Sequence, residues 1–271
     1  MIAAGVAQPP IRSADLIGFS ALLGERVRRL EAVAEQGCPV LLASHLGTRR
    51  VPNLTALLAL LLRRYGVPVV VHGPAETGGE PGRVTTAAVF RELGIEPATS
   101  LAEAQRRLVH ERIAYVPVSL LAPDIVDPLA AWCPESLRAD SSFLAQLIDP
   151  FAGAALRVVG VSRTGALPLL REFLTLTRAN ALLLRATEGE PFADPRRQPR
   201  LESFVAGAHA VWFDAAHGAP APLPELPRSP DASATAAWIT AALEGEQPVP
   251  LPIVNQLACC LLATRRAPCA A

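Results

Sequence analysis

The chain has 271 residues and a formal charge of +0, from 25 basic and 25 acidic residues; 51% of it is apolar and only 5% aromatic. This length suits one large domain or a large domain with a small appendage, and the apolar fraction excludes a disordered protein. Neutral charge excludes a general polyanion-binding surface, so any nucleic-acid site must be a local cluster of charge.

In chain order, apolar residues at helical spacing predict a first helix over 13–36, and "CPVLLA" (38–43) predicts a short buried strand. A polar turn follows, and then a helix over 53–64. Similar apolar runs predict later strands at 66–73, 112–118, 155–162 and 179–187, and the alternation in 203–214 predicts an antiparallel edge hairpin. Further helices are expected at 82–95, 100–111, 121–132, 139–149, 165–177, 231–243 and 250–264.

Continuous apolar strands that alternate with helices indicate a mostly parallel central sheet covered on both faces. The predicted fold class is therefore α/β, with a helical lobe packed beside the sheet. The longest apolar run, "LTALLALLL", is too short to span a bilayer, and the start of the chain lacks the features of a signal peptide.

The five cysteines show neither a CxxC pair nor a metal-ligand spacing, so we expect reduced thiols in a soluble, cytoplasmic protein. Every basic residue is an arginine. This indicates either a compositional bias of the source genome or a use for the rigid donor fork with which arginine binds planar anions.

The order of several segments resembles the anthranilate phosphoribosyltransferase family, also called glycosyltransferase family 3, from about residue 11 to 266. "RVPNLTALLA" stands where the family has its glycine-rich loop and Asn-x-Ser-Thr helix start, "VVVHG" at its Lys-His-Gly strand end, and "ALLLRATEGE" at its acidic strand end. "GRVTTAAVFRELG" and "PLPIVNQLACCLLA" resemble two of its helices. "GTRRVPNLT" and "ATEGEPFADPRR" look closer to a paralogous branch of the family that is associated with nucleic-acid binding.

The resemblance implies a nucleoside phosphorylase/phosphoribosyltransferase-like α/β domain, here 37–271, after a shortened N-terminal helical lobe, here 1–36. It also implies a homodimer formed through the helical lobe, although the family's first helices are missing here. Its implied ligands are phosphoribosyl pyrophosphate and Mg²⁺.

The loop after the first strand departs from the family pattern. A glycine-rich loop holds pyrophosphate with backbone N–H groups, but only Gly47 remains here, followed by Thr48, Arg49 and Arg50. We interpret the two guanidinium groups as filling the space where backbone and pyrophosphate would meet. They would favour an anion whose phosphates lie further out, as on a polymer backbone; alternatively, they only solvate a turn.

Asn53 and Thr55 match the family's phosphate-contacting residues at the next helix start, although Asn53 could simply cap that helix. His72 and Gly73 match the strand-end His-Gly of the family, where the histidine is either a ligand or a structural hydrogen-bonding residue.

Arg83 and Thr86 lie at the start of the helix predicted after the second strand, where backbone N–H groups favour an anion; the alternative is a capping turn. Glu188 and Glu190 stand where the family's acidic pair binds magnesium, and carboxylate oxygens suit that ion. A salt bridge to Arg196 or Arg197 is the alternative for these glutamates.

On the acceptor side, only Arg138 persists from the donors of related members, while Ser142 and Gln146 replace their His and Lys. Tryptophan-biosynthesis activity is therefore not expected, and no catalytic residue is assigned.

The sequence predicts binding of nucleic-acid phosphates, DNA or RNA, with little sequence preference, through an arginine-lined cleft. Its candidate residues are Arg49, Arg50, Asn53, Thr55, Arg83, Thr86, Arg138, Arg196 and Arg197. The alternatives are a phosphoribosyltransferase or phosphorylase with an unknown acceptor, and a protein whose sites have both decayed to leave a structural role.

Overall fold

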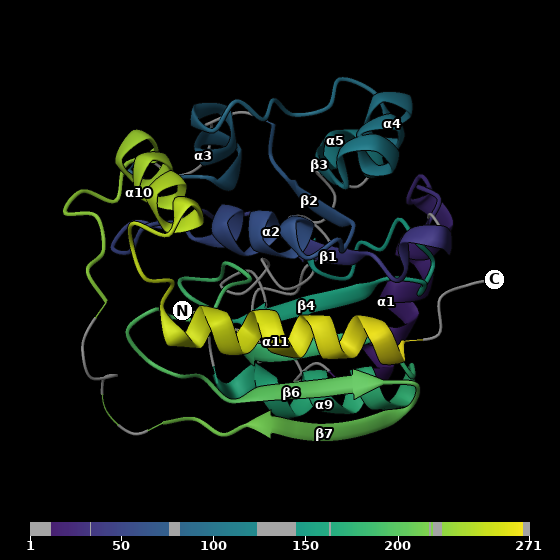
Figure 1. Cartoon of the computed structure of the whole chain (residues 1–271). Helices are drawn as coiled ribbons and strands as arrows, with labels where there is room; N and C mark the ends of the chain where they lie inside the picture. The colour runs from purple at the N-terminus through teal and green to yellow at the C-terminus, as the bar shows by residue number, and fades with distance from the viewer. Residues whose placement is uncertain are drawn as a thin grey trace, which may run out of the picture.

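The computed structural model describes residues 12–32, 34–75, 82–123, 145–162, 164–216, 218 and 224–267. Their strands form one seven-stranded sheet of order β3-β2-β1-β4-β5-β6-β7 (Figure 1). Strands β1 to β5 pair in parallel, and β6 and β7 close one edge as an antiparallel hairpin. Their bounds are β1 (Val40–Ala43), β2 (Val69–Gly73), β3 (Ile113–Pro117), β4 (Leu156–Val161), β5 (Ala181–Arg185), β6 (Leu201–Val205) and β7 (Ala208–Phe213).

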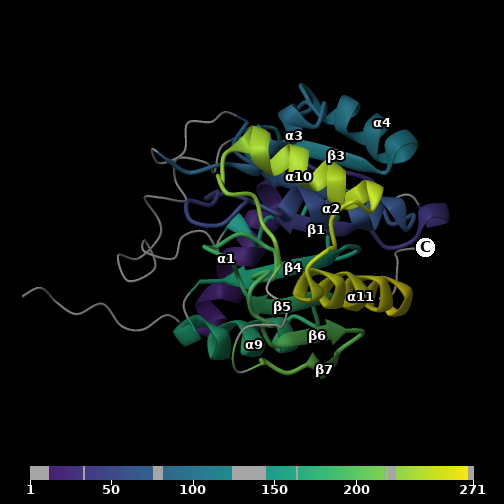
Figure 2. The same ribbon diagram turned by 60° about the vertical axis from the view of Figure 1, so that its left-hand side comes forward.

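Helices cover both faces of the sheet (Figure 2). One apolar core lies under α2 (Thr55–Arg64), α3 (Thr86–Glu92), α10 (Ala232–Glu244) and α11 (Leu251–Arg266). The other lies under α1 (Ser13–Arg26), α4 (Leu101–Glu111), α5 (Val118–Leu121) and α9 (Leu167–Leu176). Two short 3-10 helices, η1 (Ala34–Gln36) and η2 (Thr164–Ala166), complete the described elements.

The alternation of side chains along each parallel strand explains why these runs are apolar throughout. In β1, Val40 and Leu42 belong to the first core and Leu41 to the second, and all four residues of the strand are buried. A strand buried on both faces needs an uninterrupted apolar run. The predicted fold class, a mostly parallel sheet flanked by helices, is confirmed.

The first helix is shorter than the sequence predicted. It ends at Arg26, and Val27 is extended, with φ −72° and ψ 124°. The backbone N–H groups of Arg28 and Leu30 then donate to carbonyls elsewhere in the chain, those of Leu121 at 2.8 Å and Pro150 at 3.0 Å. Val27 and Leu30 still enter the same core as α1, and their burial continued the apolar spacing beyond the helix.

The division into a lobe at 1–36 and a domain at 37–271 stays a prediction. Helix α1 packs on α9 and contributes to the core under the sheet. Most of the two helices predicted at 121–132 and 139–149 lies outside the described residues. Within the described part of the chain, no helix is long and apolar enough to cross a membrane.

The topology brings several loops together at one edge of the sheet. The chain winds from β1 through β2 to β3 in one direction, and β4 and β5 lie on the other side of β1. Loops at the carboxyl ends of parallel strands meet at such a reversal point, which is where open α/β sheets bind ligands. We therefore expect a ligand site at the segments that follow β1, β2 and β5.

Candidate anion-binding site

Glu190 lies at the centre of these loops and is fully buried. Its Oε1 accepts hydrogen bonds from the backbone N–H groups of Leu46, at 3.0 Å, and Gly47, at 2.7 Å. Three hydroxyl oxygens lie within hydrogen-bonding distance of Oε2, namely those of Ser44, Thr55 at 3.4 Å and Thr86 at 3.4 Å. Burial raises the pKa of Glu190, while these hydrogen bonds act in the opposite direction.

The Glu188 carboxylate binds the second half of the loop that follows β1. Its Oε2 accepts from the N–H of Arg49, at 3.0 Å, and its Oε1 from those of Arg50, at 2.8 Å, and Val51, at 3.2 Å. Successive backbone N–H groups that converge on one acidic group form an anion-binding nest. The loop therefore keeps a main-chain cradle, and a carboxylate of the same chain occupies it.

A tight turn directs both carboxylates toward this loop. Thr187 and Glu190 pair across the turn, Glu188 has a φ of +54° and Gly189 a φ of +95°. A non-glycine residue in the left-handed region is strained by roughly 1 kcal/mol or more, and the three N–H groups that Glu188 accepts offset that strain.

Two of the predictions about this loop need correction. The space in front of its amides holds Glu188 and not the guanidinium groups of Arg49 and Arg50, whose side chains are exposed. The alternative salt bridge from the two glutamates to Arg196 or Arg197 is also wrong for the described residues. Arg196 pairs with Asp194 instead, at 3.1 Å, because Asp194 begins the same short turn.

Asn53, Arg83 and Gly47 hold the neighbouring loops together. Asn53 Oδ1 accepts from the N–H of Thr55, the first residue of α2, and from the Thr86 hydroxyl, both at 3.2 Å. Arg83 donates from Nη1 to the Gly47 carbonyl at 3.0 Å. Gly47 has a φ of +72°, and a Cβ there would lie 2.6 Å from the Val84 carbonyl oxygen.

Thr85 caps α3 by accepting from the Ala88 N–H at 3.2 Å, so the expected capping turn is confirmed.

His72 and Gly73 pack in the interior at the end of β2. His72 is buried, and its Nδ1 lies 3.1 Å from His45 Nε2, while its Nε2 has no partner in the described part of the chain. Burial lowers the pKa of His72 well below its usual range and that of His45 to about 4. A Cβ on Gly73 would lie 1.9 Å from the Ser44 carbonyl oxygen. The geometry of the histidine is that of a structural hydrogen-bonding residue.

On the acceptor side, Arg138 and Ser142 lie outside the described residues. Gln146 is buried and binds both backbone polar groups of Gly160, donating to its carbonyl at 2.6 Å and accepting from its N–H at 2.7 Å. Gln146 therefore fastens the segment before β4 to that strand.

The donor set does not match a magnesium–pyrophosphate site. Both carboxylates already accept N–H or hydroxyl groups of the chain, and the described residues contain no cluster of three or more potential metal ligands. The assignment of Glu188 and Glu190 as metal ligands stays a prediction, and no chemical step is derived from it.

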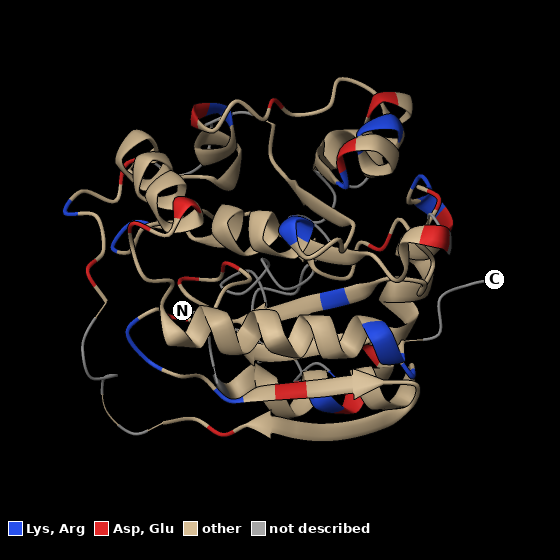
Figure 3. Ribbon diagram, in the orientation of Figure 1, with Lys and Arg blue, Asp and Glu red and all other residues tan. Residues whose placement is uncertain are grey.

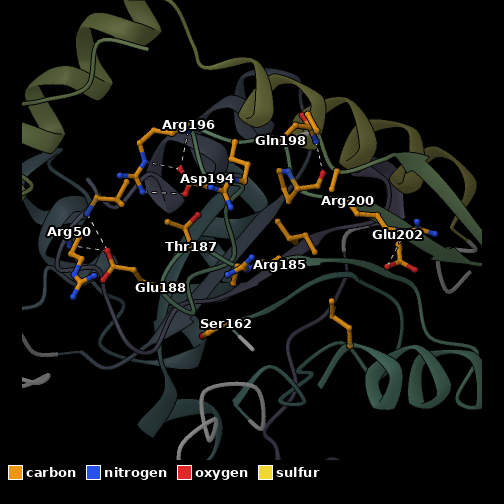
Figure 4. A pocket seen from close by; sticks show the side chains of 18 of the residues that line it. Arg50, Ser162, Arg185, Thr187, Glu188, Asp194, Arg196, Gln198, Arg200 and Glu202 are labelled. Atoms are coloured by element: carbon orange, nitrogen blue, oxygen red, sulfur yellow. Dashed lines mark hydrogen bonds and ion pairs between the residues drawn. The ribbon is translucent and has the colours of Figure 1, made fainter. Parts of the chain in front are cut away.

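A pocket of about 710 Å³ lies beside Glu188, at the ends of β4 and β5 and the start of β6 (Figure 4). It is strongly basic, because six arginines line it against three carboxylates, those of Glu188, Asp194 and Glu202. The arginines are Arg50, Arg171, Arg185, Arg196, Arg197 and Arg200. Figure 3 shows basic residues on the loop that leads into β6.

The carboxylates of the pocket all have donors. Glu202 is 2% exposed and accepts three hydrogen bonds from Arg171, of 2.7, 2.8 and 3.1 Å. It also lies 3.0 Å from His209 and 3.6 Å from Arg200. Burial alone would raise the pKa of Glu202, but the hydrogen bonds from Arg171 and His209 lower it.

Three arginines of the pocket have no carboxylate partner among the described residues: Arg50, Arg185 and Arg197. Figure 4 shows Arg185 in the middle of the pocket and Arg50 at its rim, beside Glu188.

Of these six arginines, Arg50, Arg196 and Arg197 were candidate phosphate-binding residues from the sequence, whereas Arg171, Arg185 and Arg200 were not among the candidates. One signal was present for Arg185, a single charged residue that ends a buried strand.

Comparisons with known proteins agree with this fold. No protein-family model matches the chain. Anthranilate phosphoribosyltransferase from Thermus thermophilus superimposes with a TM-score of 0.66 over 96% of this chain and 77% of its own, at 19% identity. The Saccharomyces cerevisiae enzyme, solved in complex with PRPP and Mg, gives a TM-score of 0.61 over 95% of this chain and 72% of its own, at 9% identity.

In sequence, the chain is 34% identical over 255 residues to the uncharacterized protein YbiB of Escherichia coli strain K12, a match that covers 94% of this chain and 78% of that protein. The chain thus has the anthranilate phosphoribosyltransferase fold and belongs to the family of YbiB.

Proposed function

We propose that this protein binds the phosphate groups of nucleic acids, with little sequence preference, through its arginine-lined pocket. One observation carries the proposal: Arg50, Arg185 and Arg197 line one pocket and have no carboxylate partner in the described residues. Arginine presents a planar fork of donors that matches a phosphate group, and such charge-assisted hydrogen bonds are strong.

The charge of the pocket supports a polyanionic ligand. Its six arginines exceed its three carboxylates, although the whole chain is neutral. A local basic cluster on a neutral protein is the form that nucleic-acid binding must take here.

The pocket offers no means of reading bases by stacking. None of its lining residues is aromatic. Stacking on aromatic side chains supplies much of the affinity of single-strand binding proteins, so phosphate contacts are left as the main source of affinity.

Phosphoribosyl transfer is the second candidate, favoured by the fold alone. The loop after β1 argues against it, because the amides of Leu46, Gly47 and Arg49 to Val51 already bind Glu188 and Glu190. A pyrophosphate would have to displace both carboxylates. We therefore expect added magnesium to make no difference to the melting temperature measured with millimolar phosphoribosyl pyrophosphate, whereas a magnesium–pyrophosphate site in the native state would raise it further when the ion is present.

The test of the proposal is the salt dependence of binding. Fluorescence anisotropy of a labelled single-stranded oligonucleotide is followed from about 50 to about 300 mM NaCl, where each phosphate contact contributes a slope of about 0.7 in the logarithm of affinity. The double variant Arg50→Gln/Arg197→Gln should flatten the slope by roughly 1.4.

Arg106→Gln is the matched control, since Arg106 is exposed on α4, beside β3 at the opposite edge of the sheet. Equal slopes for the double variant and this control would refute the proposal.

A further inference from the structure

The arginine-lined pocket has the size and composition of a small-molecule site. Its volume of about 710 Å³ falls within the range of roughly 300–1,000 Å³ that is usual for such sites. Apolar side chains stand among the arginines: Val51, Leu167, Leu184, Pro199, Ala215 and Ala216. The arginines can bind a charged group of a ligand, while the apolar side chains can cover an uncharged group of the same ligand.

We propose that this pocket holds a phosphomonoester, either a free mononucleotide or the phosphorylated end of a nucleic-acid strand. This inference rests on the proposed function, since the same arginines carry both. It adds that the preferred phosphate is terminal and not part of the continuous backbone.

The number of pocket arginines that have no carboxylate partner among the described residues supports a doubly charged ligand group. A phosphodiester carries one negative charge, and a phosphomonoester carries about 1.5 to 2 at neutral pH and presents three acceptor oxygens. Arg50, Arg185 and Arg197 are three cations without carboxylate partners in the described chain. A monoester satisfies more of their donors than a diester does.

The acidic groups of the pocket do not compete for these arginines. Asp194 binds Arg196, and Glu202 binds Arg171 and His209. Glu188 accepts three backbone N–H groups. Each carboxylate is thus bound to groups other than the guanidinium groups of Arg50, Arg185 and Arg197.

Ser162 supplies a neutral donor to the same pocket. It follows β4 and lines the pocket below Arg185 in the view of Figure 4. A hydroxyl beside guanidinium groups can donate to a phosphate oxygen.

Isothermal titration calorimetry with adenosine 5′-monophosphate and adenosine 3′,5′-cyclic monophosphate tests the charge argument directly. The two ligands share their nucleoside, but one is a monoester and the other a diester. We expect the monoester to bind at least about tenfold more tightly. Equal affinities, or no measurable binding of the monoester, would overturn the inference.

The variants Arg185→Gln and Arg197→Gln should each weaken binding of the monoester by about tenfold, while Arg106→Gln leaves it unchanged. Arg185 is exposed at the end of β5 and Arg197 is exposed in a loop, so both variants should fold, which their melting temperatures check. An affinity in both variants equal to that of the Arg106→Gln control would place the ligand elsewhere and overturn the proposal.

Oligonucleotides of one sequence with a 5′-phosphate or a 5′-hydroxyl distinguish the two sources. Tighter binding of the phosphorylated strand identifies the strand end, and equal binding of both strands with tight binding of the mononucleotide identifies the free nucleotide. Either result supports the monoester. Salt-dependent binding of the hydroxyl strand without mononucleotide binding would overturn this inference and leave the proposed function standing. Mononucleotide binding without strand binding would support this inference and overturn the proposed function.

Discussion

Glu188 should stabilise the loop after β1 by an amount that depends on two opposing features. Its carboxylate accepts the N–H groups of Arg49, Arg50 and Val51, while its own backbone is strained at a φ of +54°. The variants Glu188→Ala and Glu188→Gly both remove the carboxylate, but only the glycine also relieves the strain.

The magnitude follows from these contacts. Hydrogen bonds to a charged group contribute about 1.5–3 kcal/mol each when the donor is otherwise left unsatisfied. Arg49 and Arg50 are exposed, so water can replace much of what their N–H groups lose. We therefore expect Glu188→Ala to lower the free energy of unfolding by about 2 kcal/mol in total. Glu188→Gly should lower it by about 1 kcal/mol, since roughly 1 kcal/mol of strain is recovered.

Urea unfolding followed by circular dichroism measures both variants under the same conditions. Ala206→Gly is the control for strain alone, since Ala206 has a φ of +53° in the β6–β7 turn. Its substitution should raise the free energy of unfolding by up to about 1 kcal/mol. Wild-type stability in Glu188→Ala would show that the carboxylate does not hold the loop, and identical losses in the two Glu188 variants would refute the strain.

Three further changes test other parts of the structure. Because burial raises the pKa of Glu190, the folded state holds this proton more tightly than the unfolded state. The contribution of Glu190 to the free energy of unfolding is then fully present at pH values below its pKa in the unfolded state. It is lost as the pH rises through its pKa in the folded state. Urea unfolding should show this decline as the pH rises above the ordinary pKa of a glutamate, and Glu190→Gln should remove it; an unchanged pH profile would show that Glu190 does not cause the decline. Gly73→Ala should destabilise the protein by about 3 kcal/mol or more in the same assay, since its Cβ would lie 1.9 Å from the Ser44 carbonyl oxygen; wild-type stability would contradict that contact. Arg171→Ala should lower the free energy of unfolding by about 2 kcal/mol, because among the described residues it leaves the buried Glu202 with Arg200 and His209 alone as partners. A loss within about 0.5 kcal/mol of zero would show that the pair contributes little.

Much of the fold could be predicted because its strands are buried on both faces. An uninterrupted apolar run such as Val69–Gly73 has few alternatives in an α/β protein. The end of α1 was misplaced for a related reason. Burial of Val27 and Leu30 continues the helical spacing, and backbone hydrogen bonds to distant segments leave no local signal.

Some residues of the site could be predicted from the sequence, but their contacts could not. Glu188 and Glu190 were identified as a functional pair, yet their direction depends on a turn in which Glu188 adopts a positive φ. The pocket draws Arg171 from α9, Arg185 from β5 and Arg200 from the approach to β6. Only the packing of these segments shows that their side chains share one space.

A crystal structure with a short 5′-phosphorylated oligonucleotide tests the central claim most directly. The account predicts a phosphate group among Arg50, Arg185 and Arg197, with Glu188 still bound to the amides of residues 49–51. A phosphate seated on those amides, with Glu188 displaced and the arginine-lined pocket vacant, would contradict it.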